Sequence, residues 1–174
     1  PKEQKLSRTH APAEISPVEW QRVLRRQFGR EQAFGLENIG TEPFFSEFRV
    51  SNPQSKSAYR VAIRGKLPGD NYCACPDYAT NDLGTCKHIE FVLAALGKKR
   101  GAKSAFARGY HPPFSELYLR NDGGRAIHFR PGMDCPPSVL KAAGLLFDAA
   151  HGWILPQEKF GELERFVAAV IKSG

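Results

Sequence analysis

The first hydrophobic pattern along the chain predicts a helix that begins at residue 17. Apolar side chains recur there at helical spacing and form one stripe, while arginines fall on the other side: Trp20, Val23, Leu24 and Phe28 against Arg22, Arg25 and Arg26. Ser16 can cap the first turn, Pro17 suits the first helical position, and Glu19 completes a capping box. Gly29 is expected to weaken the end of this helix, and the polar residues 1–13 before it predict a tail.

Two strands are predicted next, over residues 44–50 and 59–67, because both stretches are rich in aromatic and β-branched side chains. The second stretch alternates strictly, with Tyr59, Val61, Ile63 and Leu67 on one face and Arg60, Ala62, Arg64 and Lys66 on the other. Turn residues at 51–55 join the strands, and a second turn follows at 68–71. The pattern predicts an antiparallel hairpin with one basic face.

The remaining pattern predicts a short apolar helix over 89–96 that stops at Gly97, and then a linker or mobile arm up to Tyr110. A hairpin is expected over 116–130 around the turn at 121–124, followed by a helix over 136–150 with Gly152 as its C-cap. A strand at 153–155 and a last helix over 156–172 complete the chain. The expected inward residues of these two helices are Val139, Leu140, Ala143, Phe147 and Ala150, and Phe160, Leu163, Val167, Val170 and Ile171.

Composition and charge narrow the possible partners. The chain has 174 residues, 41% of them hydrophobic, which is typical of a globular protein with a packed core. Its formal net charge of +7 favours polyanionic partners such as nucleic acid. No apolar run is long enough to span a bilayer and no signal peptide is visible, so we expect a cytoplasmic protein without membrane partners. The chain starts at Pro1, and we expect it to be a fragment of a longer protein.

One motif carries specific chemistry: Cys73-Ala74-Cys75, then ten residues, then Cys86-Lys87-His88. Zinc prefers thiolate and imidazole ligands at tetrahedral angles, and paired ligands in a tight knuckle and at a helix start can converge on one ion. Four protein ligands leave no open position, so the pattern predicts one structural Zn²⁺, with Lys87 offsetting the negative charge. The alternatives are four unrelated residues or a disulfide. Cys135 lies apart and is expected at a helix start rather than as a fifth ligand.

These elements together predict an α+β protein: an N-terminal helix and β-hairpin leading into a zinc knuckle plus short helix, followed by a small α/β module. The predicted regions are 1–40 (tail and helix), 41–110 (zinc-binding region with a basic linker) and 111–174 (α/β module with hairpin, helix, short strand and helix). The boundary is placed at His111-Pro112-Pro113.

Clustered cations predict nucleic-acid contact, most simply with DNA. The candidate contact residues are Arg60, Arg64, Lys66, Lys87, Lys98, Lys99, Arg100 and Lys103. The alternative is an ordinary solvated face and a flexible loop. A nuclease would need clustered carboxylates, but Glu116, Asp122 and Asp134 are scattered, so we expect no catalytic residues, no enzyme activity and no small-molecule substrate. His128 is expected at the surface, and His111 and His151 in a loop and at a helix end.

The metal motif and its flanks resemble the SWIM zinc finger. The resemblance rests on the CxCx10CxH spacing, on Tyr72 before it and Pro76 after the first pair, and on the strand 59–63 and the helix after His88. It covers Ser57 to Leu96 and implies Cys73, Cys75, Cys86 and His88 as the zinc ligands.

Residues 114–120, 129–132 and 160–166 are similar to the stretch that follows the finger in bacterial proteins bearing a SWI/SNF-type helicase-like ATPase. This resemblance implies a nucleoid-associated region that contacts DNA or protein next to a motor on the same polypeptide. Neither Gly65-Lys66 nor Gly97-Lys98 completes a GxxxxGK phosphate loop, so any ATPase activity would belong to residues outside this chain.

Overall fold

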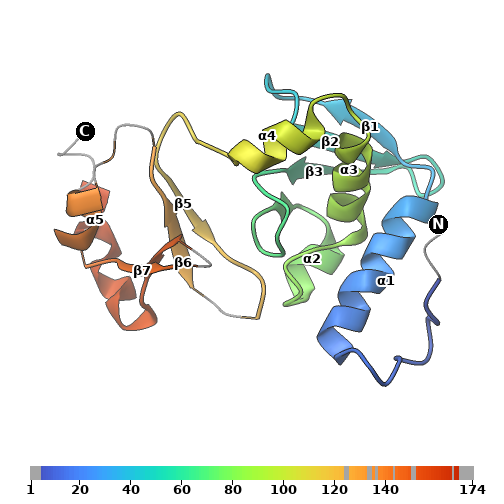
Figure 1. The fold of residues 1–174 in the computed structure, drawn as a ribbon, viewed down its shortest axis with the longest axis horizontal. Coiled ribbons are helices and arrows are strands. Elements are labelled where there is room, and N and C mark those ends of the chain that lie inside the picture. The colour runs from blue at the N-terminus through green and yellow to red at the C-terminus, as the bar shows by residue number, and fades with distance from the viewer. Residues whose placement is uncertain are drawn as a thin grey trace. The chain divides into compact units, whose positions relative to one another are not determined.

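A computed structural model describes residues 5–123, 126–132, 135, 137–142, 144–149, 152–165 and 167–168 (Figure 1). The chain forms two compact units, one comprising Pro1–Tyr110 with Asn121–Gly123 and the other His111–Arg120 with Gly124–Gly174. Each unit combines helices with a four-stranded antiparallel sheet, which confirms the predicted α+β class. None of the helices in the described ranges has the length and apolar character needed to cross a bilayer.

The sheet of the first unit contains β1 (Gly35–Asn38), β2 (Glu47–Asn52), β3 (Ser57–Ala62) and β4 (Tyr72–Cys73), hydrogen-bonded in chain order. The predicted hairpin is β2–β3, but β3 ends five residues earlier than expected. The reason is Asn71, whose side-chain oxygen accepts hydrogen bonds from the amide N–H groups of Arg64 and Gly65 at 2.8 and 3.1 Å. A longer strand would use these two N–H groups for hydrogen bonds to the neighbouring strand. β1 was not predicted, because Gly-Leu-Glu-Asn shows no clear alternation.

Four helices belong to the first unit: α1 (Pro17–Glu31), α2 (Pro76–Thr80), α3 (Lys87–Gly97) and α4 (Ala102–Arg108). α1 begins as predicted, with the Ser16 hydroxyl accepting the Glu19 amide N–H at 3.2 Å. The prediction of a linker over 97–110 was wrong, because α4 forms there. Ala102 and Ala105 are buried, and Phe106 packs edge-on against Phe44 and Phe45. Small side chains on one face therefore dock this short helix onto the unit.

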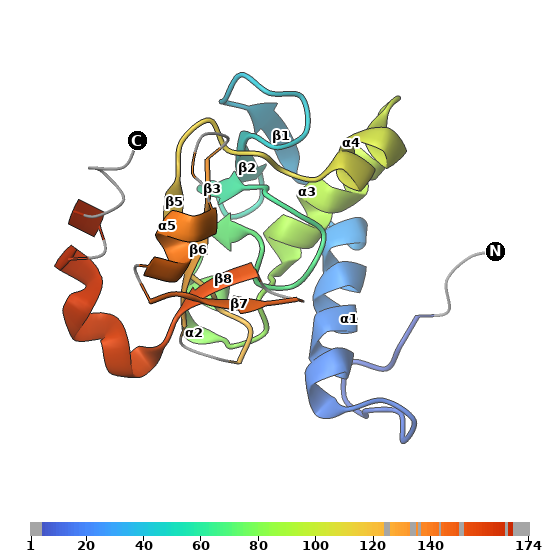
Figure 2. The same ribbon diagram turned by 60° about the vertical axis from the view of Figure 1, so that its left-hand side comes forward.

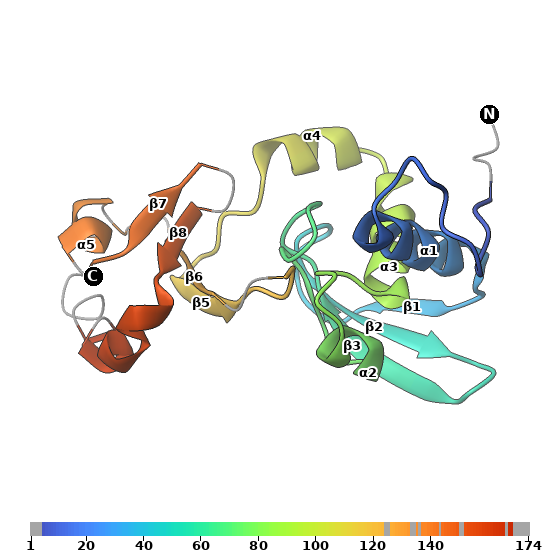
Figure 3. The same ribbon diagram turned by 90° about the horizontal axis from the view of Figure 1, so that it is seen from below.

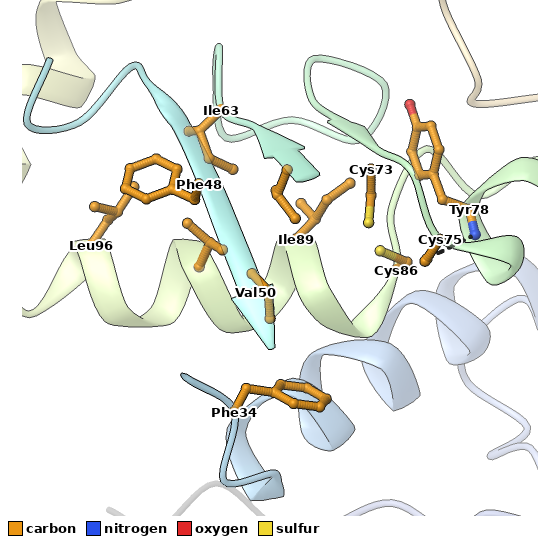
Figure 4. Close-up of a cluster of buried hydrophobic side chains, with 12 residues drawn as sticks. Phe34, Phe48, Val50, Ile63, Cys73, Cys75, Tyr78, Cys86, Ile89 and Leu96 are labelled. Atoms are coloured by element: carbon orange, nitrogen blue, oxygen red, sulfur yellow. Dashed lines mark hydrogen bonds between the residues drawn. The ribbon is translucent and has the colours of Figure 1, made fainter. Parts of the chain in front are cut away.

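The core of the first unit lies between the sheet and α3. Phe48, Val50, Val61 and Ile63 from the sheet meet Ile89, Val92 and Leu96 from α3, as Figure 4 shows for most of them. Figures 2 and 3 show α1 beside α3, with both helices on the same side of the strands. α1 continues two residues past Gly29, to Glu31. A Cβ there would lie 2.7 Å from the Lys87 carbonyl, so Gly29 allows the two helices to approach closely.

The second unit contains β5 (Glu116–Leu119), β6 (Ile127–Arg130), α5 (Pro137–Ala142), β7 (Leu146–Asp148), β8 (Gly152–Leu155) and the 3-10 helix η1 (Gln157–Glu162), in the strand order β5-β6-β8-β7. The predicted hairpin β5–β6 and strand β8 are present. The helix predicted over 136–150 is much shorter, because Gly144 takes a φ of 81° and Leu145 N–H donates to the Leu140 carbonyl at 3.1 Å, which is a Schellman C-cap.

After this cap the chain turns into β7, so Phe147 is 64% exposed rather than inward. Gly152, with a φ of 78°, begins β8 rather than capping a helix. Leu140 is buried, and Leu163 and Val167 pack against the same small core. Several residues of the predictions lie outside the described residues: Asp134, Ala143, Ala150, His151, Val170 and Ile171.

Candidate metal centre

Four side chains predicted to bind metal lie together in the first unit. One donor atom from each of Cys73, Cys75, Cys86 and His88 lies within 4.8 Å of the others, and all four residues are buried. His88 Nδ1 lies 3.8 Å from Cys73 Sγ and 4.0 Å from Cys86 Sγ. Figure 4 shows the sulfurs of the three cysteines gathered at the start of α3. All four cysteines of the chain are free thiols, so the disulfide alternative is wrong and the tetrad can hold a metal ion.

Local structure explains why the four donors converge. Cys73 ends β4 and pairs with Val61 of β3, and Ala74 N–H donates to the Arg60 carbonyl at 3.0 Å, which anchors the knuckle to the sheet. Cys75 is the N-cap of α2, where its sulfur accepts the Tyr78 amide N–H at 3.4 Å. Cys86 is the N-cap of α3, and His88 lies in the first turn of that helix, as predicted.

Two aromatic rings hold the His88 imidazole. The Phe34 ring centroid lies 5.1 Å from that of His88, and the Tyr59 centroid lies 4.9 Å from it. Phe34 comes from the segment after α1 and Tyr59 from β3, so the imidazole contacts two distant parts of the chain. These rings restrict the orientation of the ligand and exclude water from one side of the site. Tyr59 was predicted only as a strand residue on the face opposite the basic one, and Phe34 was not predicted at all.

The loop between the two ligand pairs is tied to α1. Arg25 Nη2 lies 2.8 Å from a carboxylate oxygen of Asp77, and Arg22 Nε donates to the Leu83 carbonyl at 2.9 Å. The Asn81 side chain closes the same loop by donating to the Asp77 carbonyl. The arginines lie on the side of α1 opposite its apolar stripe. This arginine side faces the segment between Cys75 and Cys86 rather than only solvent.

A buried carboxylate forms a second tie between α1 and the site. Glu90 on α3 accepts the Thr85 hydroxyl at 2.8 Å through one oxygen, and its other oxygen lies 3.3 Å from Arg26 Nε. Thr85 directly precedes the ligand Cys86. The network therefore fixes the backbone that leads into the second ligand pair.

The thiols are poised for a cation. Burial raises the pKa of the Cys86 thiol well above its ordinary value, and the hydrogen bond to Cys75 together with burial raises the pKa of Cys73 to about 12. Hydrogen bonds from Cys73 and Cys86 lower the pKa of Cys75. Three thiolates can coexist in this buried site only when a positive charge lies between them.

The predicted nucleic-acid residues fall into three groups. Arg60 and Arg64 lie 3.1 and 3.7 Å from carboxylate oxygens of Glu47, so the charge of the hairpin face is partly compensated. Lys66 and Lys87 lie over the aromatic rings of Phe106 and Phe34. The other four residues, Lys98, Lys99, Arg100 and Lys103, are exposed together where α3 meets α4.

Three remaining candidates, His128, Cys135 and Glu116, lie in the second unit. His128 is buried rather than at the surface, because β6 is an inner strand and the Tyr118 ring lies 5.5 Å from the imidazole. Cys135 packs against the core of the second unit and is not part of the tetrad. Glu116 pairs with Arg130 at 2.9 Å. Across the described residues, the tetrad is the only group of three or more Cys, His, Asp or Glu side chains placed to share a metal ion.

The arrangement can therefore bind a metal through three sulfurs and one nitrogen, inside a framework made by the sheet, α1 and α3. No family model, curated protein or solved structure matches the chain.

Proposed function

We propose that the tetrad binds one structural Zn²⁺ and that the chain is a non-catalytic module of the SWIM type. The ligand set carries the proposal: three thiolates and one imidazole are typical of structural zinc sites. Ligand atoms around tetrahedral zinc lie roughly 3.5–3.8 Å apart when the bonds are about 2.0–2.3 Å long. The distances of 3.8 and 4.0 Å from His88 to two sulfurs are close to these values. Four protein ligands leave no position for water or substrate, which argues against catalysis at the metal.

The module's proposed role is to contact nucleic acid as part of a SWI/SNF-like DNA-dependent ATPase. The resemblance of Ser57–Leu96 to the SWIM finger supports it, as does the net charge of +7. Exposed lysines and arginines attract phosphates and release bound counterions, and this term needs no base-specific contact. The site does not itself act on DNA; it holds α3 and the surfaces built on α3 in place.

A protein–protein adaptor is the second candidate, and exposed apolar side chains of the second unit favour it. Phe114 is 81% exposed, and Leu119, Leu146 and Phe147 are each more than 60% exposed. Leu119 lies on the edge strand β5, and Leu146 and Phe147 lie on the opposite edge strand β7. Edge strands with exposed apolar side chains are surfaces on which a partner protein can dock. In this role the module would dock a motor domain or another protein without contacting DNA.

Metal analysis tests the zinc assignment. Purified protein should contain one zinc per chain, and cobalt substitution should give the absorption of a tetrahedral site with three sulfur ligands. Cys86→Ser should lose stoichiometric metal and unfold the first unit, because structural zinc contributes on the order of 10 kcal/mol to such modules. Cys135→Ser is the matched control, since Cys135 lies outside the tetrad, and it should keep both metal and melting temperature. Full zinc content in Cys86→Ser would refute the ligand assignment.

A salt titration separates the two candidate roles. DNA binding through phosphates should weaken steeply as salt rises from about 50 to 200 mM. Binding to a protein partner that persists over this range, with no DNA binding at any salt concentration, would support the adaptor instead.

A further inference from the structure

The four exposed cations where α3 meets α4 form a distinct surface. We call Lys98, Lys99, Arg100 and Lys103 the α3–α4 corner. From Phe91 to Ser115 the sequence contains no aspartate or glutamate, so no acidic residue of this stretch offsets their charge. Like charges held close together repel one another and stabilise nothing by themselves. Their concentration here therefore points to an anionic ligand.

The corner residues differ from Arg25, Arg26 and Arg60 in their carboxylate partners. Arg25, Arg26 and Arg60 each lie within 3.3 Å of a carboxylate oxygen. In the described part of the chain, no carboxylate lies within ion-pair distance of any of the four corner residues, and all four are exposed. Their charges are available to a partner.

Stabilisation of α3 through its helix dipole explains only two of the four cations of the corner. Cations near the C-terminal end of a helix interact favourably with its dipole, which accounts for Lys98 and Lys99 directly after α3. The effect falls off within one turn, so Arg100 and Lys103 lie beyond its reach. A structural role therefore leaves half of the corner unexplained.

Small residues form the surface between the cations, and this surface belongs to a packed helix. Gly97, Ala102, Ser104 and Ala107 line an open depression together with Lys99 and Lys103. Side chains of this size allow a backbone to approach closely. The corner is not a mobile arm, because Ala102 and Ala105 are buried and Phe106 packs on Phe44 and Phe45. The lysines are therefore presented on an ordered surface.

We infer that the α3–α4 corner binds the phosphodiester backbone of a nucleic-acid duplex without reading its sequence. The inference rests on the proposed nucleic-acid role and assigns it to one surface. Lysine acts on phosphate as a point charge, whereas adenine is read by asparagine or glutamine and cytosine by aspartate or glutamate. No asparagine or glutamine occurs between residues 91 and 115. The corner therefore has the side chains for phosphate contact and lacks those that read adenine or cytosine.

The test compares two variants of equal charge. The corner variant carries Lys98→Gln, Lys99→Gln and Lys103→Gln. The control variant loses three exposed cations elsewhere, through Lys56→Gln, Lys141→Gln and Arg165→Gln. Zinc content is measured for each, so that a folding defect is recognised. Fluorescence anisotropy with labelled duplex DNA of two unrelated sequences, and with duplex RNA, gives the affinity at several salt concentrations.

The expected result is a smaller salt slope for the corner variant alone. The slope of log affinity against log salt should fall by about 0.9 for each lost phosphate contact on DNA, and equally for both sequences. If duplex DNA binds more tightly than duplex RNA, the phosphates that the corner contacts are those of DNA. The opposite order identifies RNA. Equal slopes for the two variants, or sequence-dependent slopes, would overturn the inference while leaving the nucleic-acid role intact. If wild-type protein with full zinc binds neither polymer, both the inference and that role fail.

Discussion

Replacing Gly29 by alanine tests how closely α1 packs on the metal module. Gly29 lies inside α1, where alanine ordinarily stabilises a helix by about 0.5–1 kcal/mol relative to glycine. Here the new Cβ would lie 2.7 Å from the Lys87 carbonyl oxygen and 2.8 Å from the Phe91 amide nitrogen of α3. Both contacts are with backbone atoms, which cannot rotate away. The two helices must therefore separate.

The cost exceeds the gain in helix propensity. Inserting a methyl group into a packed interface typically costs about 1–3 kcal/mol. After the propensity gain is subtracted, we expect Gly29→Ala to destabilise the first unit by about 1–2 kcal/mol. Separation of the helices would also strain the contact between Arg26 and Glu90, which leads to the metal ligands. The variant should therefore release zinc to a chelator faster than the wild type.

Gly97→Ala is the matched control. Gly97 ends α3, and a Cβ there would meet nothing within 4 Å. This variant should be stabilised by up to about 1 kcal/mol. Urea unfolding of zinc-saturated protein, followed by circular dichroism, measures both changes. If Gly29→Ala is stabilised as much as Gly97→Ala, the close packing of α1 on α3 is wrong.

Three further predictions concern the network around the metal, its protons and the second unit. Arg26→Met should leave the buried Glu90 carboxylate without its cation and cost about 1–3 kcal/mol in urea unfolding. Because the pKa values of Cys73 and Cys86 are raised, zinc binding should release their protons. For each unit by which the pH is lowered, the zinc affinity should then fall about tenfold per released proton, and chelator competition measures this change. Gly144→Ala should destabilise the second unit by about 1 kcal/mol, because its φ of 81° strains any residue with a Cβ, yet leave zinc content unchanged.

The candidate site could be predicted because its ligands are close in sequence. Cys73 and His88 are 15 residues apart, and a knuckle and a helix start suffice to bring them together. The support around the ligands could not be predicted in the same way. Arg25 reaches Asp77 across 52 positions and Arg26 reaches Glu90 across 64, so both contacts depend on how α1 packs on α3. A helical pattern identifies which residues share a face, but not which element that face meets.

The errors in the predicted fold have local physical causes. Residues 136–150 keep a helical spacing of apolar side chains, but one left-handed glycine at Gly144 ends the helix and allows Leu146 and Phe147 to form a strand. Residues 97–110 are rich in glycine, alanine and lysine, which suits a linker. Yet alanine is also the strongest helix former, and two buried alanines are enough to dock α4. The composition of residues 97–110 alone therefore cannot distinguish a linker from a docked helix.

The Cys/His tetrad and the α3–α4 corner lie at opposite ends of one helix, and this separation determines how a metal bound at the tetrad can influence the corner. α3 has 11 residues and is therefore about 16 Å long. This length exceeds the Debye length of about 8 Å at physiological ionic strength, so the charge of the metal site has little direct effect on phosphates at the corner. The coupling must instead be mechanical, through the packing of α3. Removing the metal should therefore weaken DNA binding, and restoring either zinc or cobalt, which carry the same charge, should recover both the affinity and the salt slope. Undiminished DNA binding by the metal-free protein would refute this mechanical coupling.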